Sequence, residues 1–293
     1  MTQDQKRLPS AKPSRSLPIS TNQLNVSATP FVKWVGGKRG IMPEFKKHLP
    51  ETFNNYYEPF VGGGALFFEM QPTIRKAYLS DINSDLITTY KVIKNDCKVL
   101  IGMLKQHNRN HNNRYFYKIR ERHNLENPVK VAARMIYLNK TCFNGLWREN
   151  KKGELNVPIG RYEKPGICQE ENLISCSKAL KGVDIACKDY LKIKPAASDF
   201  VYFDPPYHQI NKTSFTSYSK QDFTESDQAK LAEFCVSLHK RGVKVMISNS
   251  NTYFIQALYK SSIFKKNIVE APRRVNCKAD NRKSAEEVLI TNY

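Results

Sequence analysis

Residues 54–70 read NNYYEPFVGGGALFFEM, in which an apolar run ends in an acid, three glycines follow, and a second apolar run begins. The pattern predicts a strand over 54–60 and a helix over 64–70, joined by a tight turn. Glycine lets the backbone approach a ligand closely, and the first turn of a helix carries N–H groups without intrahelical partners. The stretch therefore favours an α/β fold with a ligand site at the end of a strand.

Strands and helices alternate along most of the remaining chain. Apolar runs predict further strands at 77–82, 183–187, 199–203, 243–248 and 287–292. Helices are predicted through Leu86, Tyr90 and Ile93, from Asn127-Pro128, and from a cap at Thr224. This alternation predicts an α/β fold with a Rossmann-like, doubly wound sheet.

One segment, residues 97–180, departs from the alternation. It has helical patterns but no clear parallel strand, and it contains a basic and aromatic run at 109–123 and a glycine-containing run at 143–162. We predict that 97–180 is an inserted lobe and that 30–96 and 181–293 form the sheet domain. Residues 1–29 are rich in Ser, Pro, Thr, Asn, Gln and Lys, and we expect them to be a disordered tail.

The chain is strongly basic, with 47 basic and 27 acidic residues among 293 and a net charge of +20. Such a charge favours nucleic acid or an anionic membrane surface as a partner, although a role in solubility alone remains open. No basic amphipathic helix with a broad apolar face is evident, so nucleic acid is favoured. No apolar run approaches the length of about 18 residues that a membrane span needs, and the N-terminus has no secretory apolar core. We therefore expect a cytoplasmic protein.

Seven cysteines are present, but none forms a CxxC pair and no histidine cluster accompanies them. A zinc site or a disulfide framework is therefore not expected, and we predict no metal. In a cytoplasmic protein the thiols are expected to be reduced.

Asp81 ends a predicted strand about 20 residues after the glycines, a spacing at which an acid can accept hydrogen bonds from ribose hydroxyls. A helix cap is the plainer interpretation of Asp81. The glycine turn is not a GxGxxG motif, and it begins with Glu58, whose carboxylate would repel a diphosphate. A cationic nucleoside without phosphate, such as S-adenosylmethionine, is favoured. Upstream, FVKWVGGKRG (31–40) is either a contact loop or a turn before a helix.

The run FVYFDPPYH (200–208) places an acid, two prolines and a tyrosine directly after a predicted buried strand. Rigid prolines would fix the Asp204 carboxylate and the Pro205 carbonyl as two acceptors, and Tyr207 would offer a flat stacking surface. Two acceptors beside an aromatic face suit an exocyclic NH₂ group of a planar base. Hydrogen bonds donated by that amine to the two acceptors would free its lone pair to attack a methyl sulfonium, with positioning supplying most of the rate.

The residues leave more than one function open. Adenine N6 and cytosine N4 are both exocyclic amines, and a DNA-binding regulator that has lost catalysis is a third possibility. Carbon-5 methylation of cytosine lacks a candidate nucleophile, because no Pro-Cys dipeptide occurs in the chain.

Several motifs, in order, resemble the Dam-type (D12 class) DNA adenine-N6 methyltransferases: KWVGGK, EPFVGGGALFF, SDINSDLI, FNGLWR, LNVPIGRY and DPPY. The match runs from about residue 30 to the C-terminus. The resemblance implies a methyltransferase sheet, a mainly helical target-recognition lobe with a β-hairpin, and adenine flipped out of double-stranded DNA, most often within GATC. We expect a monomer that associates with the nucleoid through DNA.

The resemblance also assigns residues to the methyl donor, S-adenosylmethionine. Trp34 and Lys38 would contact it, and Asp81 would hold its ribose. The walls of its methionine end would be Glu58, Phe60 and the turn Gly62–Gly64. The DPPY residues Asp204, Pro205, Pro206 and Tyr207 would hold the flipped base, with Asp204 also facing the methyl donor.

A further set is implied to contact DNA. Contacts near the bases would come from Lys33, Phe143, Asn144, Leu146, Arg148 and Pro158. Phosphate contacts would come from Asn139, Lys140 and Arg161. A loop over the target, 211–223, would contribute Phe215 and Tyr218.

Within this set, Phe143 would fill the gap left by the flipped base, although many family members have tyrosine there. Arg148 would read a guanine, Lys33 would reach the outer guanine, and Leu146 with Pro158 would meet thymine methyl groups. The plainer interpretations remain open: lobe core for the apolar residues, and solvated charge for Arg148 and Lys33.

Overall fold

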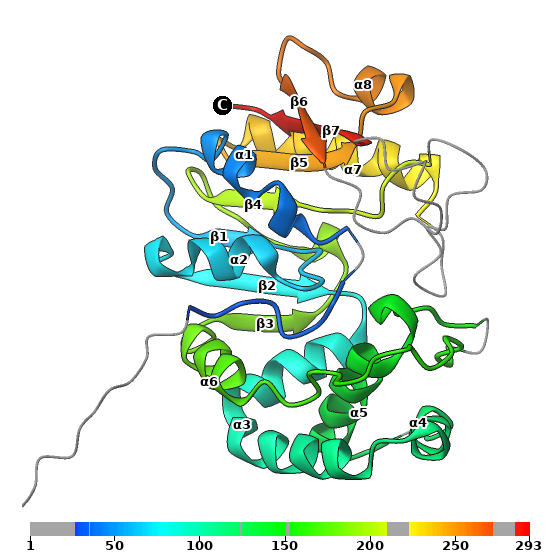
Figure 1. Ribbon diagram of the computed structural model, residues 1–293. Coiled ribbons are helices and arrows are strands. Elements are labelled where there is room, and N and C mark those ends of the chain that lie inside the picture. The colour runs from blue at the N-terminus through cyan, green and yellow to red at the C-terminus, as the bar shows by residue number, and fades with distance from the viewer. Residues whose placement is uncertain (1–26, 35, 124, 151–152, 210–222, 272–284) are drawn as a thin grey trace, which may run out of the picture.

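Seven strands form one mixed sheet in the order β3-β2-β1-β4-β5-β7-β6. The computed structural model describes residues 27–34, 36–123, 125–150, 153–209, 223–271 and 285–293 (Figure 1). The strands are β1 (Tyr56–Glu58), β2 (Ala77–Asp81), β3 (Asp184–Cys187), β4 (Phe200–Phe203), β5 (Lys244–Ser250), β6 (Lys265–Ala271) and β7 (Ala285–Thr291). The first five pair in parallel, and β7 is antiparallel to both of its neighbours.

Eight α-helices accompany the sheet in the described part of the chain. They are α1 (Met42–Lys47), α2 (Ala65–Met70), α3 (Ser84–Asn110), α4 (Asn113–Arg120), α5 (Pro128–Thr141), α6 (Glu170–Ala179), α7 (Glu225–Lys240) and α8 (Tyr253–Leu258). Two predicted helix starts are confirmed. The Asn127 side chain accepts from the Lys130 N–H at the start of α5, and Thr224 forms a capping box with Asp227 at the start of α7.

Both faces of the sheet are covered, because successive residues of a buried strand point to opposite sides. In β4, Phe200 and Tyr202 pack into the core shared with α1, α2, α3, α5 and α6. Val201 and Phe203 pack on the other side, with α7 and α8. Figure 1 shows α2 in front of the strands and α7 behind them. The α/β prediction is confirmed as a seven-stranded, mostly parallel sheet.

Strand β6 was not predicted. It lies at the edge of the sheet, pairs only with β7, and leaves Ile268 56% exposed. An edge strand buries few side chains, so its sequence lacks the apolar run from which a central strand can be predicted.

The helices α4 and α5 lie beyond the β3 edge of the sheet (Figure 1). The predicted boundary at residues 96 and 97 falls inside one helix, α3, at a kink where Asp96 has non-helical angles (φ −125°, ψ 29°). Where the β-hairpin was expected, the described residues form two isolated antiparallel bridges, Cys142–Ile159 and Glu149–Leu155. Backbone hydrogen bonds also join the two arms, from Phe143 to Pro158 and from Asn156 to Arg148.

The ordered chain begins earlier than the tail prediction places it. The Thr29 N–H and hydroxyl both donate to the Asn172 side chain on α6, at 2.9 and 3.0 Å. Residues 1–26 lie outside the described residues. Within the described part, no helix is long and apolar enough to cross a membrane, and the six cysteines are free thiols.

Candidate active site

Asp204 follows β4 directly and has one carboxylate oxygen fixed by two neighbours. Lys38 Nζ lies 2.9 Å from Oδ1, and the Ser248 hydroxyl on β5 donates to the same oxygen at 2.7 Å. Among the described residues nothing hydrogen-bonds to Oδ2, and the side chain is 23% exposed. One oxygen is therefore locked while the other is open to an incoming donor.

The rest of the DPPY turn is held by contacts from three elements. The Tyr207 hydroxyl donates to Glu287 Oε2 on β7 at 2.6 Å. The Gln228 amide on α7 donates to the Pro206 carbonyl at 2.8 Å. Pro205 is buried, and no donor reaches its carbonyl from the residues that the structure describes. The turn thus presents the two acceptors that the sequence predicted, Asp204 and Pro205, on a rigid support.

Lys38 was predicted to contact the methyl donor, and the structure places its ammonium beside the DPPY turn. It is 2% exposed, pairs with Asp204, and lies 4.6 Å from the centre of the Tyr207 ring. A buried ion pair of this kind is stable only while both partners remain. Lys38 therefore balances the charge of the Asp204 carboxylate.

The glycine turn lies between Asp81 and Trp34. Asp81, at the end of β2, accepts from the Gly62 N–H at 3.1 Å and from the Asn83 N–H at 3.0 Å. The Tyr90 hydroxyl donates to the Gly62 carbonyl at 3.0 Å. A Cβ on Gly62 would lie 2.6 Å from Trp34 Cδ1, so only glycine fits there. Three of the residues assigned to the cofactor, Trp34, Gly62 and Asp81, thus meet in one place.

Phe60 follows β1 on the other side of the strand end. It stacks on Tyr190 with ring centres 5.2 Å apart and packs edge-on against Phe203 and Phe223. This cluster makes an apolar wall next to the glycine turn.

Glu58 is buried at the end of β1, and the Tyr56 hydroxyl donates to its Oε2 at 2.8 Å. Burial raises the pKa of the Glu58 carboxyl to about 8, partly offset by the Tyr56 hydrogen bond. A cation bound beside Glu58 would favour its ionised form. The carboxyl groups of Glu58 and Asp81 lie on the strand ends that carry the glycine turn. Negative charge there suits a sulfonium nucleoside better than a diphosphate, which it would repel.

The Glu58 pKa predicts a pH-dependent stability in the absence of cofactor. Its folded-state value lies above the ordinary value of about 4.3, so the folded protein holds a proton that the unfolded chain releases between these pH values. The stability contributed by that proton is complete below about pH 4 and is lost as the pH rises through 8. Glu58→Gln should therefore raise Tm at pH 9 by roughly 10 °C or more and change it much less at pH 5. Parallel curves of Tm against pH for the two proteins would contradict this.

Gly62→Ala tests the glycine cradle. The new methyl group would push against Trp34, and alanine is strained at the Gly62 φ of +46°. We expect cofactor affinity, measured by calorimetry, to fall more than about tenfold, since a close contact of this kind costs at least about 1.4 kcal/mol. Gly182→Ala is the matched control, because Gly182 also has positive φ (+76°) but nothing lies within 4 Å of its added Cβ. Equal cofactor affinity in both variants would refute the assignment.

The predicted DNA-contacting residues of the 143–162 segment lie mostly on its surface. Phe143 is 43% exposed, and Asn144 and Pro158 are exposed. Arg148 is partly exposed, and its Nε donates to the Asn156 side chain at 2.9 Å. Leu146 is half-buried and packs on the main core.

Asn139 has a different role from the predicted phosphate contact. It is fully buried, and its amide oxygen accepts from the Lys33 N–H at 2.7 Å. Its amide nitrogen donates to the carbonyls of Lys33 and Gly145, at 2.8 and 3.1 Å. Because all its hydrogen bonds are used inside the protein, Asn139 joins the N-terminal loop to the recognition segment rather than touching phosphate.

The other predicted cations lie at or near the surface. Lys33 Nζ is 3.3 Å from the Tyr162 hydroxyl and 4.5 Å from the centre of that ring. Arg161 is exposed. Phe215 and Tyr218 fall outside the described residues.

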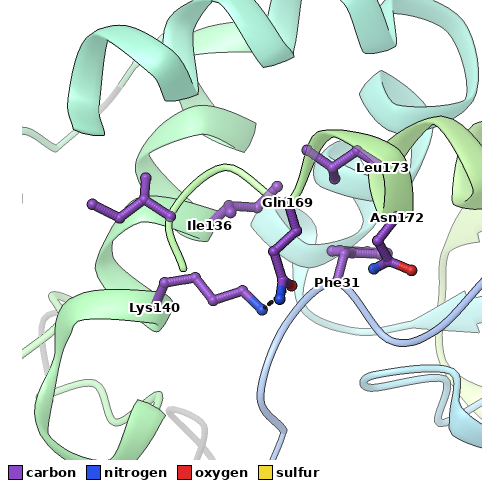
Figure 2. Close-up of a pocket in the computed structure, with 7 residues that line it drawn as sticks. Phe31, Ile136, Lys140, Gln169, Asn172 and Leu173 are labelled. Atoms are coloured by element: carbon purple, nitrogen blue, oxygen red, sulfur yellow. Dashed lines mark hydrogen bonds between the residues drawn. The ribbon is translucent and has the colours of Figure 1, made fainter. Parts of the chain in front are cut away.

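Lys140 lines a small depression between α5 and α6, and its Nζ donates to Gln169 at 3.0 Å (Figure 2). Phe31, Ile136, Ile167, Asn172 and Leu173 complete the lining. No residue of the DPPY turn or of the glycine turn lines this depression. We therefore do not assign the cofactor to this depression.

Sequence reasoning missed three residues that support the site: Ser248, Gln228 and Glu287. For Ser248 the available signal was the polar run Ser248–Ser250 at the end of the apolar strand β5, which a purely structural strand would not need. Among the described residues, no group of three His, Cys, Asp or Glu side chains is arranged to hold a metal.

A mostly parallel sheet with a glycine cradle at β1, an acid at the end of β2 and DPPY after β4 defines an amino-methyltransferase that uses S-adenosylmethionine. The family model for the D12 class N6 adenine-specific DNA methyltransferases matches residues 34–276. The chain belongs to this family, whose members use S-adenosylmethionine.

Similar proteins include two named as type II methyltransferases. M.MjaIII of Methanocaldococcus jannaschii is 46% identical over 287 residues, which cover 90% of this chain and 99% of that protein. M1.LlaDCHI of Lactococcus lactis subsp. cremoris is 39% identical over 285 residues, 94% of this chain and 98% of that protein. The DNA adenine methylase of Escherichia coli K12 is 34% identical over 265 residues, 88% of this chain and 93% of that protein.

Proposed function

We propose that this adenine-N6 DNA methyltransferase flips its target adenine out of the duplex and acts within GATC. The observation that carries the first part is the arrangement of Asp204, whose Oδ1 is held by Lys38 and Ser248 while Oδ2 has no partner among the described residues. Flipping costs a few kcal/mol of unstacking, which hydrogen bonds and stacking at the DPPY turn would offset.

In the proposed mechanism, the bound cofactor supplies an electrophilic methyl group. Asp204 Oδ2 and the Pro205 carbonyl accept hydrogen bonds from the two amine hydrogens, while Tyr207 stacks on the purine. These contacts favour a pyramidal nitrogen, whose lone pair forms the new N–C bond as the S–C bond breaks. The extra proton on nitrogen then leaves toward Asp204 Oδ2 and solvent. The protein contributes positioning and electrostatics, with no covalent enzyme intermediate.

The GATC proposal rests on the motif FNGLWR…LNVPIGRY, through Arg148 for a guanine, Lys33 for the outer guanine, and Leu146 with Pro158 for thymine methyl groups. Phe143, exposed at the start of this segment, is proposed to fill the space left by the adenine. We also propose that residues 97–180 act as the recognition lobe, that 30–96 and 181–293 act as the catalytic domain, and that the chain binds DNA as a monomer.

Mapping of modified bases tests the site and the chemistry together. DNA from a methylase-deficient host that expresses the protein should carry N6-methyladenine in GATC and no N4-methylcytosine. N6-methyladenine in another sequence would refute GATC alone, whereas N4-methylcytosine would refute the amine assignment. The same map from a host with a partner nuclease would show whether the chain protects restriction sites.

Arg148→Ala and Lys140→Ala should differ in how they change DNA binding. Loss of a bidentate arginine–guanine contact costs about 1–3 kcal/mol at one base position. Loss of a phosphate contact weakens all sequences alike and lowers the salt dependence. Competition binding against single-base variants of the site measures both. A uniform loss for Arg148→Ala would contradict base readout.

A further inference from the structure

Ser248 lies beside Asp204 because of the register between β4 and β5. Phe203 pairs with Ile247 across these parallel strands, so the next residues, Asp204 and Ser248, are level with each other. Ser248 is fully buried, and its hydroxyl is 2.7 Å from Asp204 Oδ1. Its distance to the Tyr202 hydroxyl on β4 is 2.9 Å. Ser248 therefore joins the catalytic carboxylate to a buried tyrosine.

The direction of this chain follows from the donors available. A serine hydroxyl has one proton, and an ionised carboxylate only accepts. The Ser248 hydroxyl must therefore donate its hydrogen bond to Asp204, and the Tyr202 hydroxyl must donate to Ser248. Tyr202 can do so at any working pH, because burial raises the pKa of its hydroxyl well above the ordinary value. Two donors, Ser248 and Lys38, thus converge on Oδ1 and leave Oδ2 without a described partner.

From this geometry we propose that Ser248 is a positioning residue for methyl transfer: by holding Oδ1, it fixes the rotamer of Asp204 so that Oδ2 faces the target amine. Tyr202 in turn fixes Ser248. Lys38 alone would fix the Asp204 rotamer less well, because its ammonium is a point charge on a flexible side chain and does not impose one direction on the carboxylate. A carboxylate misplaced by about 1 Å can cost about a hundredfold in rate. The inference depends on the adenine-N6 activity of the family and not on GATC.

The test is the single-turnover rate of methyl transfer to unmethylated plasmid DNA, with enzyme in excess and tritium-labelled cofactor. Ser248→Ala should lower this rate about 10- to 100-fold, while the dissociation constants of DNA and cofactor change less than threefold. Ser248→Thr, which keeps the hydroxyl, should recover most of the rate. Tyr202→Phe should give a smaller loss, because the Ser248–Asp204 bond remains. A purely structural role for Ser248 would lower Tm and weaken both ligands together, and would leave no rate loss at saturation.

Two controls keep the result decisive. Tyr259→Phe removes a tyrosine hydroxyl that is equally buried but has no hydrogen-bond partner among the described residues, so the rate should stay within twofold of wild type. If Ser248→Ala does not stay folded at the assay temperature, Ser248→Cys decides the question, because it keeps the side chain's shape with a weak S–H donor. A slow Ser248→Cys enzyme supports the proposal. A wild-type rate in Ser248→Ala or in Ser248→Cys overturns it.

Discussion

Asp204→Ala should lower the single-turnover rate of methyl transfer by about 10³-fold or more, the scale on which loss of one preorganised polar group acts in an active site. Two effects combine. The target amine loses an acceptor, and the buried Lys38 ammonium, 2.9 Å from Oδ1, loses its counter-charge. Removal of one partner of a buried ion pair costs about 3–5 kcal/mol of stability, so Tm should fall as well. Duplex binding should persist if the assay is run below that Tm.

Asp204→Asn restores part of what Asp204→Ala removes. Its amide oxygen can still accept from Lys38 and Ser248, but the counter-charge of Lys38 is lost in both variants, so Tm should lie between those of wild type and Asp204→Ala. Its NH₂ then replaces Oδ2 and faces the target amine with donors instead of an acceptor, so the rate should be as low as in Asp204→Ala. A wild-type turnover in either variant would show that Asp204 does not hold the base.

Asp81→Ala should weaken cofactor binding by about 100-fold or more, equivalent to roughly 2.7 kcal/mol. The Asp81 side chain is expected to stabilise bound cofactor in two ways. It is assigned to the ribose, and it accepts from the N–H groups of Gly62 and Asn83, which holds the glycine turn in place. Isothermal titration with S-adenosylhomocysteine measures the loss without turnover.

Asp85→Ala is the matched control for that variant. Asp85 is also a partly buried acid, in the first turn of α3, but it faces Arg134 rather than the glycine turn. Its removal should leave cofactor affinity within threefold of wild type. A wild-type affinity in Asp81→Ala would refute the ribose assignment, and equal losses in both variants would point to general damage to α3.

Much of this molecule follows from local patterns. The central strands are fully buried, so their apolar runs stand out, and the glycines at 62–64 and the prolines at 205–206 mark conformations that few other residues adopt. Helix caps such as Thr224 are equally local. These features predicted the sheet and marked the glycine turn and the DPPY turn as candidate ligand-binding segments.

The parts that could not be predicted depend on contacts between distant segments. Lys38 meets Asp204 across 166 positions of the chain only after the N-terminal loop folds over β4. Asn139 looks like a surface residue at a helix end, yet it is buried by the same loop. Glu287 reaches Tyr207 because β7 inserts antiparallel between β5 and β6, an order that no local pattern encodes.

The most direct measurement is the structure of a ternary complex with duplex DNA and S-adenosylhomocysteine. We expect the extruded adenine to place its amino nitrogen within about 3.2 Å of both Asp204 Oδ2 and the Pro205 carbonyl, with Ser248 still on Oδ1 and the Tyr207 ring against the purine. An adenine that remains stacked in the duplex, or an amino nitrogen more than about 4 Å from both acceptors, would contradict the account.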